Sequence, residues 1–164
     1  MVEANELISS LNLVGTDEAV LDDKGRLLFS KKKRDALGEN FVLAQGPLSN
    51  LVLYPANTWA ELVADFGKYE RLNFGRQQYT RLLFGTAAAD LKFDGQGRLV
   101  IPAKLREKGK IKEKDKVLLI GCGDYIEIWS ETEWEKFNEF PEVYGRERRE
   151  ALDRAYSQMK DSQF

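Results

Sequence analysis

The sequence predicts a β-rich α+β fold in which two copies of one strand-containing unit share a single core. A short motif occurs twice, at residues 22–34 and 94–106, offset by 72 residues and identical at six of thirteen positions. Apolar runs bounded by glycine follow each copy. No low-complexity linker separates the copies, so we expect pseudo-two-fold halves and short helices packed around one small barrel-like core.

Each copy of the motif is expected to form a β-hairpin. In the first copy the first strand is expected at residues 20–21, the turn at 22–25 and the second strand at 26–29. In the second copy the corresponding ranges are 91–93, 94–97 and 98–101. Asp at the first turn position can accept backbone N–H groups, and Gly at the last position tolerates positive φ. The repeated unit is therefore a tight turn that displays an arginine, Arg26 or Arg98.

Further strands are expected after each hairpin, at residues 41–44, 51–54, 116–120 and 125–129. Pro102 and Gly109 bracket a short helix over residues 103–108. In the first copy Ser30 and Lys33 stand where the second copy has Pro102 and Leu105. The first copy is therefore expected to gain charge and to lose helical order at this point.

Apolar residues at helical spacing predict longer helices outside the strands. The expected faces are Trp59, Leu62, Val63 and Phe66, then Trp134 and Phe137, then Leu152, Ala155, Tyr156 and Met159. We predict a first repeat at 13–67, a helical connection at 68–88, a second repeat at 89–140 and an amphipathic C-terminal helix at 141–164. That helix could dock on this subunit or on a neighbour.

Composition excludes several classes of function. The 164 residues include no histidine and one cysteine, Cys122, which removes the commonest general base, the commonest metal ligand and any internal disulfide. No apolar run approaches the ~18 residues of a membrane span, and the N-terminus lacks the pattern of a secretion signal. We therefore expect a cytoplasmic, non-catalytic protein with no cofactor, no metal, no membrane contact and no small-molecule substrate.

The charge is segregated along the chain. The net charge is −2, yet residues 22–34 carry +4, residues 104–116 carry +4 and residues 131–164 carry −3. One basic segment is the first copy of the motif and the other begins at the end of the second copy, which is compatible with a DNA-binding face on an acidic protein. Residues 110–116 are expected to be a solvated loop and strand edge.

Together, the twofold Asp-x-x-x-Arg with Gly before the Arg, the Leu-Val-Ile-Pro-Ala-Lys-Leu-Arg segment at 99–106 and the strand followed by a Trp-containing helix resemble the MraZ proteins. These are bacterial transcriptional regulators with two AbrB-like swapped-hairpin halves, and the resemblance covers residues 13–140. It implies binding to repeated DNA elements upstream of the protein's own division and cell-wall gene cluster, nucleoid association and a homo-oligomeric ring. It also implies that the loops face double-stranded DNA, through Asp22, Lys24, Arg26, Asp94 and Arg98.

The basic residues after each turn are candidates for phosphate contacts, which position a protein on DNA without reading its sequence. They are Lys31, Lys32, Lys33 and Arg34 in the first copy, and Lys104 and Arg106 in the second. A solvated basic surface is the alternative for each. Because the first copy is more basic, we expect unequal DNA faces with the first hairpin dominant.

Other interpretations of the same residues remain open. Each Asp–Arg pair could brace its own turn instead of, or as well as, presenting the arginine to a DNA groove. The tryptophans could stack on bases, although core packing fits their positions better. A cluster of Asp22, Asp23 and Asp94 would be needed for metal or acid–base chemistry, without other ligands to support it. The main competing function is an oligomeric scaffold that does not bind DNA.

Overall fold

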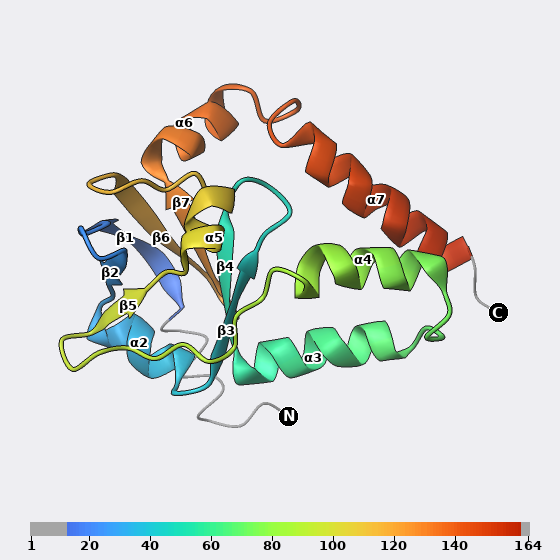
Figure 1. Ribbon diagram of the computed structural model, residues 1–164, viewed down its shortest axis with the longest axis horizontal. Coiled ribbons are helices and arrows are strands. Elements are labelled where there is room, and N and C mark those ends of the chain that lie inside the picture. The colour runs from blue at the N-terminus through green and yellow to red at the C-terminus, as the bar shows by residue number, and fades with distance from the viewer. Residues whose placement is uncertain (1–12, 162–164) are drawn as a thin grey trace.

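The computed structural model describes residues 13–161 and divides them between a sheet and a helical arm (Figure 1). The strands are β1 (Val14–Val20), β2 (Arg26–Leu28), β3 (Phe41–Gln45), β4 (Leu51–Pro55), β5 (Arg98–Val100), β6 (Lys116–Cys122) and β7 (Ile126–Ser130). The helices are α2 (Lys31–Leu37), α3 (Ala56–Gly67), α4 (Phe74–Phe84), α5 (Ala103–Lys108), α6 (Glu131–Glu139) and α7 (Arg146–Asp161). The α+β fold class predicted from the sequence is confirmed.

The two repeats interleave in one antiparallel sheet. Its strand order is β1-β6-β7-β4-β3, so two strands of the second repeat lie between strands of the first. One buried cluster draws on both repeats and includes Leu27, Leu53, Leu99 and Ile128. The predicted joint core follows directly from this strand order, because neither repeat holds a complete sheet of its own.

The local hairpins predicted for the two motifs are wrong in their strand pairing. β1 pairs with β6, whereas β2 pairs with β5 of the other repeat. The entering strand predicted at 91–93 is reduced to an isolated bridge between Phe93 and Leu99. Each turn closes locally, but the strand that leaves it exchanges its partner with the other copy. This exchange buries Leu27 and Leu99, both fully inaccessible, beneath the two-stranded β2–β5 ribbon.

The expected loss of helical order in the first copy is also wrong. α2 extends over seven residues, and α5 matches the predicted Ala103–Lys108. Ser30 caps α2, because its hydroxyl accepts a hydrogen bond from the backbone N–H of Lys33. Serine is among the best N-cap residues, so it replaces the helix-starting role of Pro102 rather than weakening it.

The tryptophans pack in the protein rather than on its surface, as expected. Trp129 is 1% exposed and its ring centroid lies 5.2 Å from that of Trp134. Trp59 lies 5.0 Å from Phe84. Edge-to-face and tilted pairs at such distances contribute to packing beyond simple burial.

The helical arm consists of α3, α4 and α7, with α7 packed along α4 of the same chain (Figure 1). Gly75 allows this approach, since a Cβ there would lie 2.0 Å from the backbone nitrogen of Met159. α7 occupies Arg146–Asp161 of the segment in which the C-terminal helix was predicted, residues 141–145 form turns, and residues 162–164 lie outside the described part. Two residues of the predicted apolar faces, Val63 and Tyr156, are instead 43% and 46% exposed. Within residues 13–161, no helix is long and apolar enough to cross a membrane.

Candidate nucleic-acid interface

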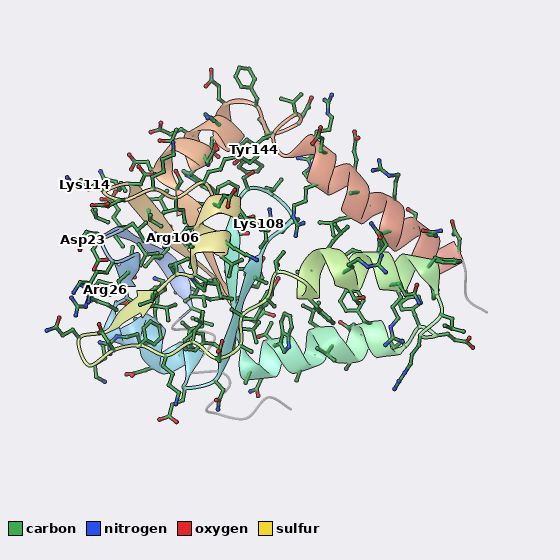
Figure 2. All side chains as sticks on the ribbon, in the orientation of Figure 1. Asp23, Arg26, Arg106, Lys108, Lys114 and Tyr144 are labelled. Carbon is green, nitrogen blue, oxygen red and sulfur yellow. The ribbon has the colours of Figure 1, made fainter. Side chains whose placement is uncertain are left out.

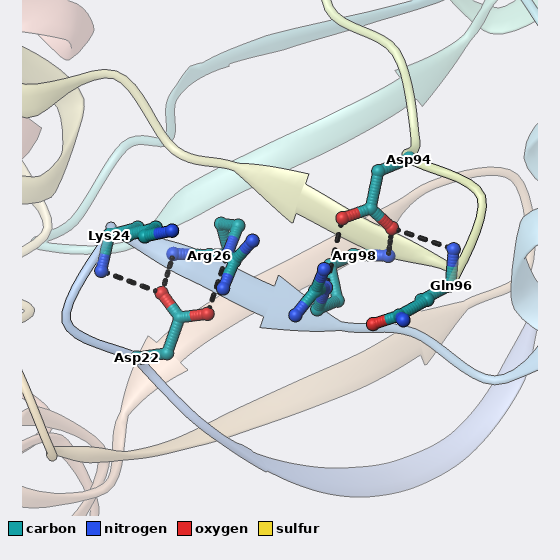
Figure 3. A network of polar contacts seen from close by, with 6 residues as sticks. All are labelled: Asp22, Lys24, Arg26, Asp94, Gln96 and Arg98. Carbon is teal, nitrogen blue, oxygen red and sulfur yellow. Dashed lines mark hydrogen bonds and ion pairs between the residues drawn. The ribbon is translucent and has the colours of Figure 1, made fainter.

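The first loop is closed by its own aspartate. The backbone N–H of Asp22 donates to the Arg26 carbonyl at 3.0 Å, and that of Gly25 donates to the Asp22 carbonyl at 3.1 Å. The Asp22 carboxylate accepts the backbone N–H groups of Lys24 and Arg26 through Oδ1, each at 2.9 Å. Its Oδ2 accepts Nε of Arg26 at 2.6 Å. One carboxylate therefore fixes both the turn and the arginine (Figure 3).

The second loop repeats this geometry. Oδ1 of Asp94 accepts the backbone N–H groups of Gln96 and Arg98 at 2.9 Å, and Oδ2 accepts Nε of Arg98 at 2.9 Å. The side chains at the third loop position differ, because Lys24 in the first copy corresponds to Gln96 in the second (Figure 3). The two loops are thus matched in backbone, in the Asp–Arg pair and in net charge, because Asp23 in the first copy offsets Lys24 whereas the second copy has Gly95 and Gln96 there.

Both aspartates are held in the ionised form. Desolvation raises the pKa of Asp22, but hydrogen bonds from Arg26 and Lys24 outweigh it and bring the pKa below its usual value. The backbone N–H of Arg98 is the main reason that the pKa of Asp94 is lowered. A lowered folded-state pKa contributes stability above the unfolded-state value, and this contribution is lost as the pH falls through the folded-state value. The Asp–Arg pairs therefore persist throughout the neutral range.

The β2–β5 ribbon places both arginines on one outward face. Arg26 pairs with Val100, and Leu28 pairs with Arg98, in antiparallel register. Directly paired residues point to the same side of a sheet, and alternate residues share a face. Since Leu27 and Leu99 face the core, the other four side chains face outward. Within residues 13–161 no hydrogen bond uses the terminal Nη atoms of either arginine, so both guanidinium ends are available to a ligand.

The exposed lysines predicted after each turn lie at the beginnings of α2 and α5. Lys32 and Lys104 occupy equivalent positions, and both are exposed. Lys31 is also exposed but forms an ion pair with Asp35 at 2.8 Å. These three side chains are therefore accessible to phosphate groups.

Lys33 does not fit the predicted role of a DNA contact. Its side chain is only 4% exposed, and its Nζ lies 2.9 Å from Oδ2 of Asp17. Nζ also donates to the Val14 carbonyl at 3.4 Å. The charge points into the protein toward β1, because Lys33 occupies the buried helix position that Leu105 fills in the second copy. We correct its assignment to a structural ion pair.

We expect Lys33→Leu to keep DNA affinity within about twofold of wild type and to leave the thermal midpoint unchanged or higher. Replacing a buried ion pair by apolar contacts is often neutral or stabilising, and Asp17 can remain solvated because its side chain is 42% exposed. Lys32→Leu removes the same charge from an exposed site and is the matched control. Equal losses of DNA affinity in the two variants, measured by fluorescence anisotropy, would return Lys33 to the DNA face.

Arg34 and Arg106 connect the two repeats. Nε of Arg34 donates to the Phe29 carbonyl at 3.2 Å, and Nε of Arg106 donates to the Ile101 carbonyl at 3.0 Å. Each guanidinium then lies over the loop glycine of the other copy. A Cβ on Gly97 would lie 2.7 Å from Nε of Arg34, and one on Gly25 would lie 2.9 Å from Cζ of Arg106. These arginines contact the exchanged strands through Nε, and their assignment as DNA contacts stays a prediction.

The same crossing is reinforced by backbone hydrogen bonds. The Phe29 N–H donates to the Gly97 carbonyl at 3.0 Å, and the Ile101 N–H donates to the Gly25 carbonyl at 2.8 Å. Each loop is therefore bound to the end of the strand that leaves the other loop. The position of Arg26 depends on the second repeat, and that of Arg98 depends on the first.

Sequence reasoning missed a lysine beside the first loop. The backbone N–H of Lys114 donates to the Leu21 carbonyl at 2.8 Å, and that of Leu21 donates to the Asp115 carbonyl at 3.1 Å. Lys114 has φ of 70°, an uncommon conformation for a residue other than glycine. Figure 2 shows it at the edge of the sheet with Asp23 and Arg26, opposite the helical arm. The alternating charges around it gave no sequence signal for this position.

The structure does not bring Asp22 and Asp94 together. Asp22 and Asp94 lie at opposite ends of the antiparallel ribbon, each bound to its own arginine (Figure 3). Among residues 13–161, no group of three acidic or cysteine side chains is arranged to hold a metal ion.

Comparison with known proteins gives a consistent result across the chain. Residues 13–85 and 83–149 each match the family model described as "MraZ protein, putative antitoxin-like". A protein named transcriptional regulator MraZ from Thermoanaerobacter sp. (strain X514) is 38% identical over 141 residues, covering 86% of this chain and 96% of the relative. Proteins of the same name from Alkaliphilus oremlandii (strain OhILAs) and Lactiplantibacillus plantarum (strain ATCC BAA-793 / NCIMB 8826 / WCFS1) are 34% and 35% identical, covering 76% and 75% of this chain and 85% of each relative.

Proposed function

The chain belongs to the MraZ family, and on that premise we propose that it is a transcriptional regulator that binds double-stranded DNA through the outward face of the β2–β5 ribbon. The observation that carries this proposal is the pair of arginines on that face. The carboxylates of Asp22 and Asp94 accept hydrogen bonds from Nε of Arg26 and Arg98, and the Nη atoms of both arginines remain free to donate to a ligand. A fixed guanidinium offers two parallel donors to O6 and N7 of guanine.

The Asp–Arg pair then has both roles that the sequence left open. The aspartate braces the turn, and by doing so it holds the arginine in one orientation before DNA arrives. Less side-chain entropy is lost on binding when the contacting group is already ordered. Lys24, Lys31, Lys32 and Lys104 surround this face or follow it in the chain, and we assign them to phosphate contacts.

Several copies of the ribbon would act together. We propose a homo-oligomeric ring in which neighbouring subunits each contact one short element of a repeated promoter sequence upstream of the division and cell-wall genes. Linked weak contacts multiply in affinity through effective concentration. Such an arrangement reconciles DNA binding with a net charge of −2, because only one face of the ring needs to be positive. We further propose that the protein associates with the nucleoid in the cytoplasm.

The difference between Lys24 and Gln96 provides a matched test of the DNA face. Lys24→Gln removes a positive charge from the first loop and Gln96→Lys adds one to the second, while Asp23 and Gly95 stay as they are. We expect the slope of log K against log salt, per subunit engaged, to become shallower by about one unit in Lys24→Gln and steeper by about one unit in Gln96→Lys. Unchanged slopes in both variants would show that the loops do not lie near phosphate.

The proposed function is tested by a gel shift on the DNA upstream of the protein's own gene. Binding that weakens with salt and prefers this DNA over a scrambled duplex of equal composition supports the regulator. An oligomer that binds neither DNA at low salt would instead be the scaffold considered above.

A further inference from the structure

Two exposed aliphatic side chains lie between the arginines of the ribbon. Leu28 is 59% exposed and Val100 is 50% exposed, whereas Leu27 and Leu99 on the opposite face are inaccessible. Neither Leu28 nor Val100 belongs to a buried cluster of the chain. The outward face of the ribbon is therefore a small apolar surface with an arginine at two diagonally opposed corners.

Single exposed aliphatic residues are ordinary on protein surfaces. Leu28 and Val100 differ from these because they share one face of the ribbon with Arg26 and Arg98. Each aliphatic side chain lies directly across the strand pair from an arginine, since Arg26 pairs with Val100 and Leu28 pairs with Arg98. A ligand that meets the guanidinium groups must also meet these side chains.

The unused guanidinium donors of the face favour DNA as that ligand. Both aspartates are already bound to their arginines, and the exposed Lys24 and Asp23 beside them offset each other in charge. The ribbon also has a suitable width, because its strands lie about 4.8 Å apart and the major groove, about 12 Å wide, admits a two-stranded ribbon. In that groove the thymine C5-methyl is the apolar group of the base edges.

We propose that Leu28 and Val100 contact thymine methyl groups in the major groove, next to the guanines bound by Arg98 and Arg26. This inference rests on the proposed function and adds a specificity to it. Cross-strand neighbours have Cβ atoms about 5 Å apart, and base pairs rise by about 3.4 Å. Each contacted guanine should therefore have a thymine within one or two base pairs, on either strand.

Deoxyuridine tests this directly, because it lacks only the methyl group of thymidine. The upstream DNA is prepared with thymidine or with deoxyuridine, and full-length protein is titrated against both by fluorescence anisotropy. We expect substitution to weaken wild-type binding by about fourfold for each methyl group in contact. In Leu28→Ala/Val100→Ala the same substitution should have no effect, because the contacting side chains are absent.

The chain provides a matched control on the helical arm. Leu72 and Val63 are exposed, at 83% and 43%, and lie away from the ribbon. Leu72→Ala/Val63→Ala removes the same two side-chain types. This variant should still bind deoxyuridine DNA more weakly than thymidine DNA, by the same factor as wild type; this factor is the uracil effect. The inference is overturned if wild-type protein binds both DNAs equally, or if Leu28→Ala/Val100→Ala retains the wild-type uracil effect. If Leu28→Ala/Val100→Ala changes the size of the oligomer and retains the uracil effect, Leu28 and Val100 form contacts between subunits instead of contacts with DNA.

Failure of the proposed function gives a different result. Wild-type protein would then bind neither DNA, and no uracil effect could be measured for any variant. Salt-sensitive binding without a uracil effect leaves the regulator in place and removes only the thymine contacts.

Discussion

The double variant Arg26→Ala/Arg98→Ala is expected to bind its operator at least about thirtyfold more weakly than wild type while remaining folded. A bidentate arginine–guanine pair contributes about 1–3 kcal/mol of discrimination, and 1.4 kcal/mol corresponds to a tenfold change. Both arginines lie on the outward face of the ribbon, with side chains 19% and 30% exposed, and each aspartate keeps the backbone hydrogen bonds that close its turn.

Two further variants separate charge from geometry. Arg26→Lys/Arg98→Lys keeps both positive charges but removes the planar fork. It should retain salt-dependent binding to any duplex while losing the preference for the operator. Arg71→Ala/Arg154→Ala removes two exposed arginines from the helical arm and is the control for net charge. If this control loses as much affinity as Arg26→Ala/Arg98→Ala, the ribbon is not the DNA face.

The second large effect is expected on stability, from the loop glycines. Gly25 and Gly97 have φ of 74° and 82°, and each lies against an arginine of the other copy. Gly25→Ala and Gly97→Ala should each lower the free energy of unfolding by about 1–3 kcal/mol, because of backbone strain, and should also displace the arginine. In Gly25→Ala/Gly97→Ala we expect the free energy of unfolding, measured with urea, to be lowered by at least the sum of the two single losses.

Gly38→Ala measures backbone strain in the absence of an arginine contact. Gly38 has φ of 75° and ψ of −171°, and a Cβ there would meet nothing within 4 Å. This conformation is essentially restricted to glycine, so the loss of stability in Gly38→Ala is a reference for strain alone. Losses in Gly25→Ala and Gly97→Ala that exceed this reference would show that the arginine contacts add to the strain.

The sequence predicted the local structure well. The repeated Asp and Gly positions identified both turns, because a carboxylate that accepts backbone N–H groups and a residue that tolerates positive φ are local requirements. The helix at 103–108 and the later strands followed from similarly local signals. The Asp–Arg pairs, four residues apart, were also foreseeable from spacing alone.

Strand pairing could not be predicted in this way. The hydrogen bonds that close the loop at Asp22 and Arg26 are compatible with either a local hairpin or an exchanged one. The choice is made by packing of Leu27 against its counterpart Leu99, which lies 72 residues away. The family resemblance supplied the swapped arrangement that periodicity could not.

Identity between the two copies was informative but ambiguous. Arg26 and Arg34 are both repeated in the second copy, yet the first faces outward and the second lies over a glycine of the other repeat. Repetition marks a shared constraint without saying whether it is structural or functional. Lys33 shows the converse, since a charge unique to one copy is buried against Asp17 from a distant strand.

Dimethyl sulfate interference will show whether Arg26 and Arg98 read guanine in the major groove. This reagent methylates guanine at N7 in the major groove and adenine at N3 in the minor groove. On the DNA upstream of the protein's own gene, we predict that guanine methylation at repeated positions prevents binding, whereas adenine methylation does not. Binding that tolerates guanine methylation throughout, or is prevented only by adenine methylation, would contradict the account.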